Sequence, residues 1–340
     1  MAVSRIIEQD VLVIGAGPAG LSVAAECAYH GLSSVRLVEK GASHNQTVSL
    51  FYPDEKRVDA AYRGQPAECA GVLCFRDTSK PGFLELMDSY LKQFAFAVDY
   101  NVAVDSIKKG SDGMFLVSTG DGRLYGSRFV VISVGRMGKP NRPEYFNAIP
   151  ASVRAHVHFD TRNLDATGKR ILVVGGGNSA VEYAIALSKK GQVVLSYRKE
   201  AFTRVNSLNL DNLETAEMEG RVMVWRNSNI SAIGEFNGQP KVVFQEGHAQ
   251  IFDKAVYAIG GSSPAGFLAA AGLELDDKGN PKLSPTLESS VAGLFVAGEL
   301  AAPQGKGSII ASFNSGKIVV QGIMETIGLE RRPELVSLAR

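Results

Sequence analysis

The sequence contains little cysteine and no long apolar run. Three cysteines among 340 residues are too few for a fold stapled by disulfides and are typical of a reducing compartment. No apolar stretch reaches the roughly 18–20 residues that span a bilayer. The first residues lack the basic and apolar segments of a secretory signal. We therefore expect a cytoplasmic protein with no membrane partner.

An excess of charge of one sign is also missing. The chain has 36 basic and 35 acidic residues, for a formal net charge of +1. This balance provides no basic field, so nucleic-acid binding is not expected. The neighbouring Cys69 and Cys74 supply too few ligands for a metal ion, and no metal site is expected either. The length instead suits two soluble domains of ordinary size.

Glycine, by contrast, is abundant and follows short apolar runs. The chain has 36 glycines, well above the usual share of about 7%. Near-continuous apolar runs predict buried parallel strands at 10–14, 35–39, 129–133, 170–174, 193–197, 254–259 and 294–297. Helical stretches at 19–29 and 179–190 alternate with them. The pattern predicts an α/β protein.

One pattern of strand, glycine cluster, helix and strand occurs twice, from Asp10 and from Arg170. A linker-like stretch rich in proline, glycine and basic residues lies between the copies at 136–143, and a second crossing is expected near 260–264. We therefore expect two Rossmann-like dinucleotide-binding domains. Residues 1–140 and 261–340 would form one discontinuous domain, with the other, 141–260, inserted in it.

The first glycine cluster has the spacing of a dinucleotide fingerprint. Its predicted cofactor-binding residues are Gly15, Gly17, Pro18, Ala19 and Gly20. The first glycine permits a tight turn, the second lets the backbone approach a pyrophosphate, and the third allows close helix–strand packing. The pyrophosphate then lies at the positive end of the following helix. Glu39 closes the next strand, where an acid binds the 2′-hydroxyl of an unphosphorylated ribose.

The second cluster differs at the ribose position. Its predicted binding residues are Gly175, Gly177, Asn178, Ser179 and Ala180. No carboxylate ends the following strand, which runs into Arg198 and Lys199, with Arg204 nearby. A guanidinium can grip a 2′-phosphate in a bidentate manner, so the pattern favours NADPH over NADH. The alternative is that these cations are an ordinary solvated strand end.

Taken together, these motifs resemble the thioredoxin-reductase-like branch of the two-dinucleotide flavoproteins over nearly the whole chain. The resemblance implies that residues 1–140 and 261–340 form the FAD-binding domain and that residues 141–260 form the NAD(P)H-binding domain. Gly135, in Ser-Val-Gly, stands where that family has Ala-Thr-Gly, and Gly260 marks the exit from the NADPH domain. Gly298 and Glu299 resemble the second FAD motif, where the family usually has aspartate. The resemblance implies a helix opening near Ser308 and Ile309, with its dipole towards the flavin. It also adds Lys40, Gln46 and Asp59 to the flavin site.

The chain departs from thioredoxin reductases in its cysteines, because residues 141–260 contain none. The stretch 50–59 resembles the Leu-Tyr-Pro-Glu-Lys segment of ferredoxin–NADP reductases built on the same plan. The string at 175–180 is shared with bacillithiol-disulfide-reductase-like proteins. The resemblance implies FAD and NADPH as cofactors and, as electron acceptor, a small redox protein such as flavodoxin or ferredoxin, or a low-molecular-weight disulfide.

Cys69 and Cys74 lie in the expected FAD half with four residues between them. This spacing is similar to the redox disulfide of the glutathione-reductase type, although that pair follows the ribose acid more closely. We expect two unrelated thiols, with a redox pair as the alternative. Cys27, in an amphipathic first helix, is expected to be a small core residue.

The leading hypothesis is a homodimeric NADPH-dependent flavoprotein oxidoreductase that passes hydride from NADPH to FAD and then electrons to an acceptor. Two alternatives stay open. One is an enzyme like the flavin monooxygenases, which also carry two fingerprints. The other is a non-catalytic FAD and NADPH sensor that binds a partner according to its redox state.

Overall fold

The computed structural model describes residues 6–52, 56–60, 68–136, 140–161, 164–261, 264–302 and 307–328. The chain divides into two compact units, one formed by residues 1–138 and 263–340 and the other by residues 139–262. The second unit is therefore inserted in the first. Each unit is built around its own sheet and is described by itself.

The first unit contains a seven-stranded sheet in the order β5-β2-β1-β8-β7-β6, with β17 also paired to β8. Its strands are β1 (Ile6–Ile14), β2 (Val35–Glu39), β5 (Ala97–Tyr100), β6 (Val104–Lys109), β7 (Phe115–Thr119), β8 (Leu124–Ile132) and β17 (Leu294–Val296). The pairs that β1 forms with β2 and β8, and the pairs β2–β5 and β8–β17, are parallel, so those strands end at one edge. Strands β6, β7 and β8 form an antiparallel meander.

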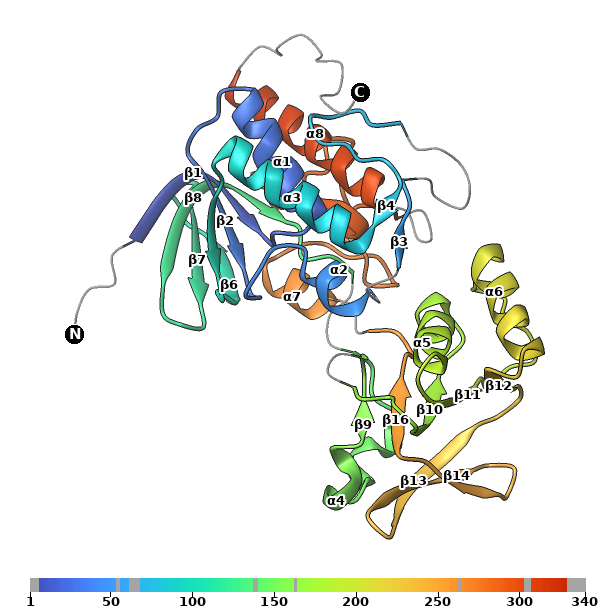
Figure 1. Cartoon of the computed structure of the whole chain (residues 1–340). Helices are drawn as coiled ribbons and strands as arrows, with labels where there is room; N and C mark the ends of the chain where they lie inside the picture. The colour runs from blue at the N-terminus through green and yellow to red at the C-terminus, as the bar shows by residue number, and fades with distance from the viewer. Residues whose placement is uncertain are drawn as a thin grey trace. The chain divides into compact units, whose positions relative to one another are not determined.

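One face of this sheet is covered by α1 (Pro18–Tyr29), α3 (Lys80–Phe94) and α8 (Ile309–Ile327), which lie side by side in Figure 1. Helix α1 is buried along almost its whole length, Cys27 included, so it is a core helix rather than the amphipathic one expected. Helices α1 and α8 approach closely, and Ser22 Oγ donates to Phe313 O at 2.7 Å. The smaller elements are α2 (Gln46–Phe51), α7 (Ala265–Ala270), β3 (Arg57–Val58) and β4 (Thr78–Ser79).

The second unit contains a five-stranded sheet in the order β12-β11-β10-β16-β9, and every described pairing in it is parallel. Its strands are β9 (Val157–His158), β10 (Arg170–Val174), β11 (Gln192–Ser196), β12 (Val222–Trp225) and β16 (Lys254–Tyr257). The helices are α4 (Ala151–Arg154), α5 (Asn178–Ser188) and α6 (Ser207–Met218). An antiparallel sheet of β13 (Ile230–Phe236), β14 (Gln239–Phe244) and β15 (Ala249–Ile251) completes the unit.

The seven strands predicted from the sequence are all present. The strand expected at 170–174 has those bounds, whereas β1 begins four residues earlier than expected, at Ile6. The mixed α/β fold is therefore confirmed. Within the described ranges, none of the helices combines the length and apolar character needed to cross a bilayer.

Candidate functional site

The first glycine turn lies at the carboxyl end of β1 and leads into α1. Gly15 has φ +105°, and a Cβ there would lie 2.6 Å from Ser133 O. A Cβ at Gly20 would lie 2.0 Å from Gly15 O, so the helix approaches the strand as closely as a fingerprint requires. A Cβ at Gly17, by contrast, would meet no heavy atom within 4 Å. The turn is therefore closely packed at Gly15 and Gly20 and open at Gly17, at the helix N-terminus, where an anion can bind.

Ser133 anchors this turn and was missed as a site residue by sequence reasoning. It follows β8, and its buried hydroxyl donates towards Ile14 O and Gly15 O at 3.0 and 2.9 Å. Its backbone N–H also donates to Ile14 O, at 2.8 Å. The Ser-Val-Gly segment therefore fixes the carbonyls behind the glycine turn.

Glu39, at the end of β2, is buried next to the same turn. Its Oε2 accepts from the N–H of Ala16 at 2.9 Å, and its Oε1 accepts from the N–H of Gly41 at 2.8 Å. A carboxylate oxygen has more than one lone pair, so both oxygens keep capacity for a hydroxyl donor. The two backbone N–H groups therefore fix the orientation of the Glu39 carboxylate.

Asn45 lies against the glycine turn and has no counterpart among the predicted site residues. It is 1% exposed and left-handed at φ +50°, and its N–H donates to Ala16 O at 2.8 Å. Its amide pairs with His44 Nδ1 at 2.7 Å, while Oδ1 has no hydrogen-bond partner in the described structure. A buried polar atom beside a dinucleotide turn fits a bound polar ligand, because leaving it unsatisfied is costly.

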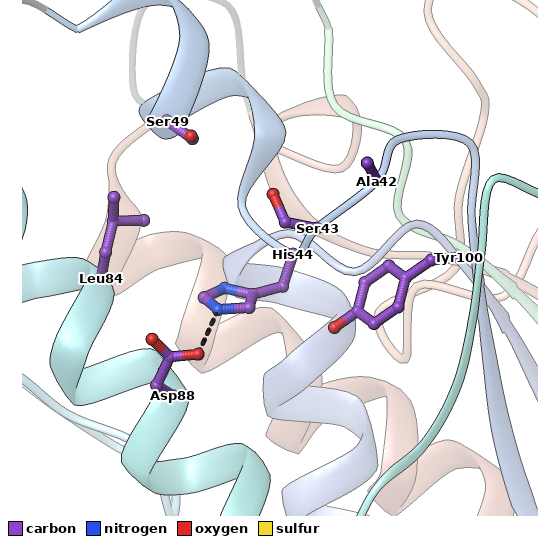
Figure 2. Close-up of a pocket in the computed structure, with 7 residues that line it drawn as sticks. All are labelled: Ala42, Ser43, His44, Ser49, Leu84, Asp88 and Tyr100. Carbon is purple, nitrogen blue, oxygen red and sulfur yellow. Dashed lines mark hydrogen bonds and ion pairs between the residues drawn. The ribbon is translucent and has the colours of Figure 1, made fainter.

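A cavity of about 340 Å³ lies beside the loop that follows Glu39 (Figure 2). Its lining comprises Ala42, Ser43, His44, Ser49, Leu84, Asp88 and Tyr100. His44 Nε2 lies 2.9 Å from Asp88 Oδ1 on α3, which ties the loop to the helix layer. Burial raises the pKa of Tyr100, and the nearby carboxylates of Asp88 and Glu39 act in the same direction.

The second predicted flavin motif meets the first at the start of α1. A Cβ at Gly298 would lie 3.0 Å from Ala19 Cβ, and Gly298 N–H donates to Ser315 Oγ of α8 at 2.8 Å. Glu299 is exposed next to this contact. Ser308 caps α8, where its Oγ accepts from Ala311 N–H at 3.0 Å, so the helix opens at Ile309 as predicted. Two helix N-termini, those of α1 and α8, therefore flank one sheet edge.

Three other predicted flavin-site residues, Lys40, Gln46 and Asp59, form no described contact with the first glycine turn or with the N-terminus of α8. Lys40 is exposed, and Gln46 Nε2 donates to Ser43 Oγ at 2.8 Å. Asp59 is exposed and pairs with Arg57, Nε to Oδ1, at 2.6 Å. Gly135, with φ +69°, lies three residues beyond the end of β8, at the same edge as Gly15.

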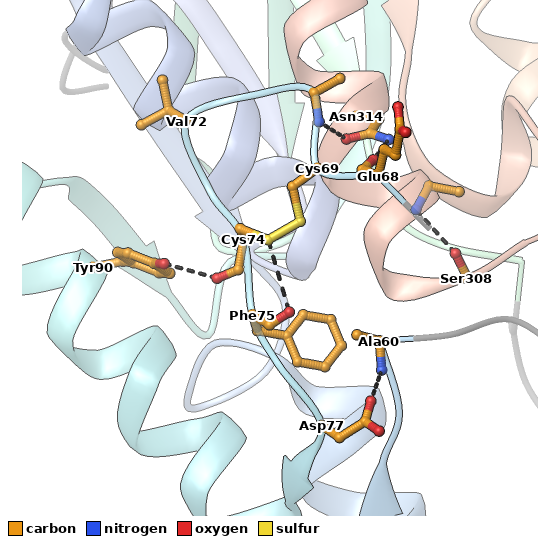
Figure 3. The surroundings of a disulfide bond; sticks show 12 residues. Ala60, Glu68, Cys69, Val72, Cys74, Phe75, Asp77, Tyr90, Ser308 and Asn314 are labelled. Atoms are coloured by element: carbon orange, nitrogen blue, oxygen red, sulfur yellow. Dashed lines mark hydrogen bonds between the residues drawn. A yellow bond between two sulfur atoms is a disulfide. The ribbon is translucent and has the colours of Figure 1, made fainter. Parts of the chain in front are cut away.

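The two thiols expected to be separate form a disulfide, Cys69–Cys74, with a Cα–Cα distance of 5.7 Å (Figure 3). The expectation failed because spacing alone does not show that a chain folds back on itself. The loop is fixed to α8, where Asn314 Oδ1 accepts from Ala70 N–H at 2.9 Å and Asn314 Nδ2 donates to Glu68 O at 2.8 Å. Tyr90 Oη donates to Cys74 O at 2.8 Å.

The second glycine turn, in the other unit, repeats the geometry of the first. A Cβ at Gly175 would lie 2.3 Å from Ala258 O, whereas one at Gly177 would meet nothing within 4 Å. Gly176 lies under the Tyr197 ring, a contact the sequence did not signal: a Cβ there would be 1.9 Å away. Asn178 Oδ1 is engaged locally, accepting from Asn206 N–H at 2.9 Å.

The predicted phosphate-binding cations lie on the loop after β11. Arg198 and Lys199 are exposed, and the backbone of Arg204 forms an isolated bridge with Gly177. The loop is folded by stacking of Tyr197 on Phe202, with centroids 4.7 Å apart. This fold-back brings Arg204 beside the glycine turn. Gly260, with φ +86°, follows β16.

Among the residues that the structure describes, no three His, Cys, Asp or Glu side chains gather as metal ligands would. The first unit carries a glycine turn, two helix N-termini and a disulfide, and the second unit carries a glycine turn of its own. Two such turns, one beside a buried acid and one beside exposed cations, define the class of two-dinucleotide Rossmann proteins.

Comparisons with known proteins agree with this geometry. The family model described as pyridine nucleotide-disulphide oxidoreductase matches residues 12–298. A ferredoxin–NADP reductase of Paraburkholderia phymatum is 30% identical over 89% of this chain and 84% of its own. Ferredoxin–NADP reductase 2 of Shouchella clausii is 27% identical over 89% and 88%. The bacillithiol disulfide reductase of Staphylococcus aureus has the same fold, with TM-score 0.78 and 20% identity over 94% of this chain and 99% of that one.

The chain belongs to the pyridine nucleotide-disulphide oxidoreductase family. It is an FAD-dependent NADPH oxidoreductase on the thioredoxin-reductase plan. The fold and the class expected from the two fingerprints are thereby confirmed. The electron acceptor and the roles of single residues are a separate question.

Proposed function

We propose that the first unit holds FAD through the Gly15–Gly20 turn, with Glu39 on the adenosine ribose. The open helix N-terminus at Gly17 and the Oδ1 of Asn45, which has no hydrogen-bond partner in the described structure, support this assignment. Gly298, Glu299 and the N-terminus of α8 at Ser308 would hold the ribityl and flavin end. FAD supplies two-electron exchange between a hydride donor and an acceptor. The protein supplies binding, orientation and fixed positive dipoles.

The second unit would bind NADPH through the Gly175–Ala180 turn, with Arg198, Lys199 and Arg204 on the 2′-phosphate. Their exposure and the fold-back of the loop onto Gly177 support this. We also propose that the protein works as a homodimer in the cytoplasm. Sedimentation equilibrium of the purified chain tests the dimer, and a single monomeric species would contradict it.

The electron acceptor proposed here is a disulfide, reached through Cys69–Cys74, and the observation that carries this is the disulfide itself. Two electrons and two protons open it to a dithiol. The dithiol then attacks an external disulfide, a mixed disulfide forms, and the second thiol resolves it, which releases two thiols and restores Cys69–Cys74. The reductase activity of the family supplies the electrons. Cys69 is the more exposed of the two residues and would attack first, while Cys74 is buried.

The position of the disulfide loop supports this exit for electrons. Asn314, which binds the loop on both sides of Cys69, is five residues beyond the first residue of α8. At 1.5 Å per residue the anchor is about 7.5 Å along the helix from the N-terminus assigned to the flavin. Phe75, next to Cys74, also packs against Phe313 of the same helix, with centroids 6.1 Å apart.

A second acceptor is favoured by the relatives, several of which are named ferredoxin–NADP reductases. Under this alternative the electrons leave one at a time to a small carrier protein, and the disulfide is structural. The double variant C69S/C74S separates the two proposals because it removes the thiols and leaves both glycine turns intact.

The experiment is an anaerobic titration with NADPH, followed by alkylation and mass spectrometry. We expect the wild type to take up two reducing equivalents more per FAD than C69S/C74S, with two alkylated thiols at Cys69 and Cys74. Reduction of a low-molecular-weight disulfide is lost in the double variant, while reduction of ferricyanide persists. Equal uptake by both proteins would contradict the disulfide exit and leave the carrier protein as acceptor. Flavin that stays unbleached in the titration would instead favour the sensor. A long-lived flavin hydroperoxide, formed when oxygen is then admitted to the reduced protein, would favour the monooxygenase.

A further inference from the structure

A buried carboxyl group lies directly under the disulfide loop. Glu26 of α1 is 2% exposed, and its Oε1 accepts from the N–H of Val72 at 2.6 Å. Val72 lies between the two cysteines, inside the small ring that the disulfide closes. Gly71 permits this approach, because a Cβ there would be 2.3 Å from Glu26 Oε1. The carboxyl group therefore lies between helix α1 and the backbone of the disulfide loop.

The charged and titratable groups around Glu26 come from two helices. At the C-terminal end of α1, His30 Nε2 lies 4.0 Å from Glu26 Oε2, and the next residue after Glu26 is Cys27, whose thiol is buried. On α8, Lys317 attracts the carboxylate and donates through Nζ to Ala70 O at 2.8 Å. Burial raises the pKa of Glu26 despite the opposing Val72 N–H and Lys317. An ionised Glu26 is thus costly already in the oxidised protein.

Opening the disulfide makes this cost larger. Two electrons enter with two protons. If only one proton binds a sulfur, the other sulfur is a thiolate in a ring that contacts a buried carboxylate, and like charges in a poorly solvated site cannot both stay ionised. The second proton must therefore be held close to the sulfurs. Glu26 is the group whose position and burial suit it to hold that proton.

We propose that Glu26 is the proton-holding residue of the dithiol: it takes up one proton when the disulfide opens and releases it when the disulfide closes. Glu26 does not touch the sulfurs in this structure and acts through the loop, so it is a positioning and proton-storing residue. The inference rests on the proposed disulfide exit, but the chemistry of the pair can be tested without NADPH.

The test uses the FAD-loaded protein reduced with dithiothreitol, and measures the rate of thiol alkylation against pH by mass spectrometry. Glu26→Gln keeps an acceptor for Val72 N–H but removes the negative charge and the proton site. At alkaline pH the wild type has lost this proton and carries a negative charge beside the thiols, whereas the variant does not, so we expect the alkylation profile of Glu26→Gln to move to lower pH by about one unit. Glu68→Gln is the matched control, since Glu68 is next to Cys69 in sequence but exposed, and its profile should move little.

A measurement on the wild type covers the case in which Glu26→Gln does not fold. Infrared difference spectra between the oxidised and dithiothreitol-reduced protein should show a new protonated-carboxyl band. Its absence, or equal shifts for Glu26→Gln and Glu68→Gln, would overturn the proposal. If dithiothreitol opens the pair with the expected pH shift but NADPH does not open it, the proposed disulfide exit fails while the role of Glu26 stands.

Discussion

The hydroxyl of Ser133 donates to the carbonyl of Gly15 at 2.9 Å and so joins the end of β8 to the first glycine turn. In Ser133→Ala this bond is lost and the buried carbonyl loses a donor, which costs about 1 kcal/mol. We expect a slightly lower melting temperature for the FAD-loaded protein and faster loss of flavin on dilution. Ser231→Ala, whose exposed hydroxyl donates to Val243 O in the other unit, is the control and should retain flavin normally.

The first glycine turn offers a sharper test, because substitutions at two of its glycines are expected to have different effects. Gly20→Ala places a methyl group 2.0 Å from Gly15 O, so the protein itself is destabilised. Gly17→Ala meets no protein atom within 4 Å and should fold with near-normal stability, but its methyl group obstructs the pyrophosphate. We expect a stable, colourless Gly17→Ala protein whose FAD affinity falls at least about tenfold, or about 1.4 kcal/mol. A yellow Gly17→Ala with normal affinity would place the cofactor elsewhere.

The two strand–turn–helix units could be located from the sequence for a physical reason. The strand–turn–helix unit is local, and its glycines are demanded by backbone contacts a few residues apart, such as Gly15 with Gly20. Asn45 could not be found that way, because its importance comes from a left-handed turn that brings it back against Ala16. Glu26 and Asn314 were missed for the same reason: each acts on the loop at 68–72 from a helix far away in sequence. The Cys69–Cys74 bond depends on those long-range supports.

Arg198 provides the test of nucleotide choice. Removing a charged hydrogen-bond donor to the 2′-phosphate costs about 1.5–3 kcal/mol. We therefore expect Arg198→Ala to lower kcat/KM for NADPH roughly tenfold or more, with that for NADH nearly unchanged. Arg226, which is paired with Glu217 at 2.8 Å in the same unit, supplies the control variant Arg226→Ala. An equal loss with both nucleotides would show that Arg198 is not a phosphate ligand.

Asn314 is expected to control access to the disulfide. Its side chain holds the backbone on both sides of Cys69, so Asn314→Ala frees two loop groups at once. We expect dithiothreitol to reduce Cys69–Cys74 several-fold faster in this variant, since the sulfurs become easier to reach. Thr326→Ala alters the last turns of α8, where Thr326 Oγ1 donates to Gly322 O, and serves as the control. Equal reduction rates in the three proteins would mean that another contact holds the loop closed.

The raised pKa of Glu26 makes a prediction about the oxidised protein in which no electron transfer is involved. A carboxyl group whose pKa is higher in the folded than in the unfolded state binds its proton more tightly when folded. Its contribution to stability therefore falls as pH rises from the unfolded value, about 4.3, through the folded one, and stays lower above it. Glu26→Gln does not titrate, so the melting temperature of the variant relative to wild type should rise between about pH 4 and neutrality. Glu68→Gln, on an exposed carboxylate, should show a much smaller trend, and a trend of opposite sign for Glu26→Gln would mean that Lys317 and Val72 outweigh burial.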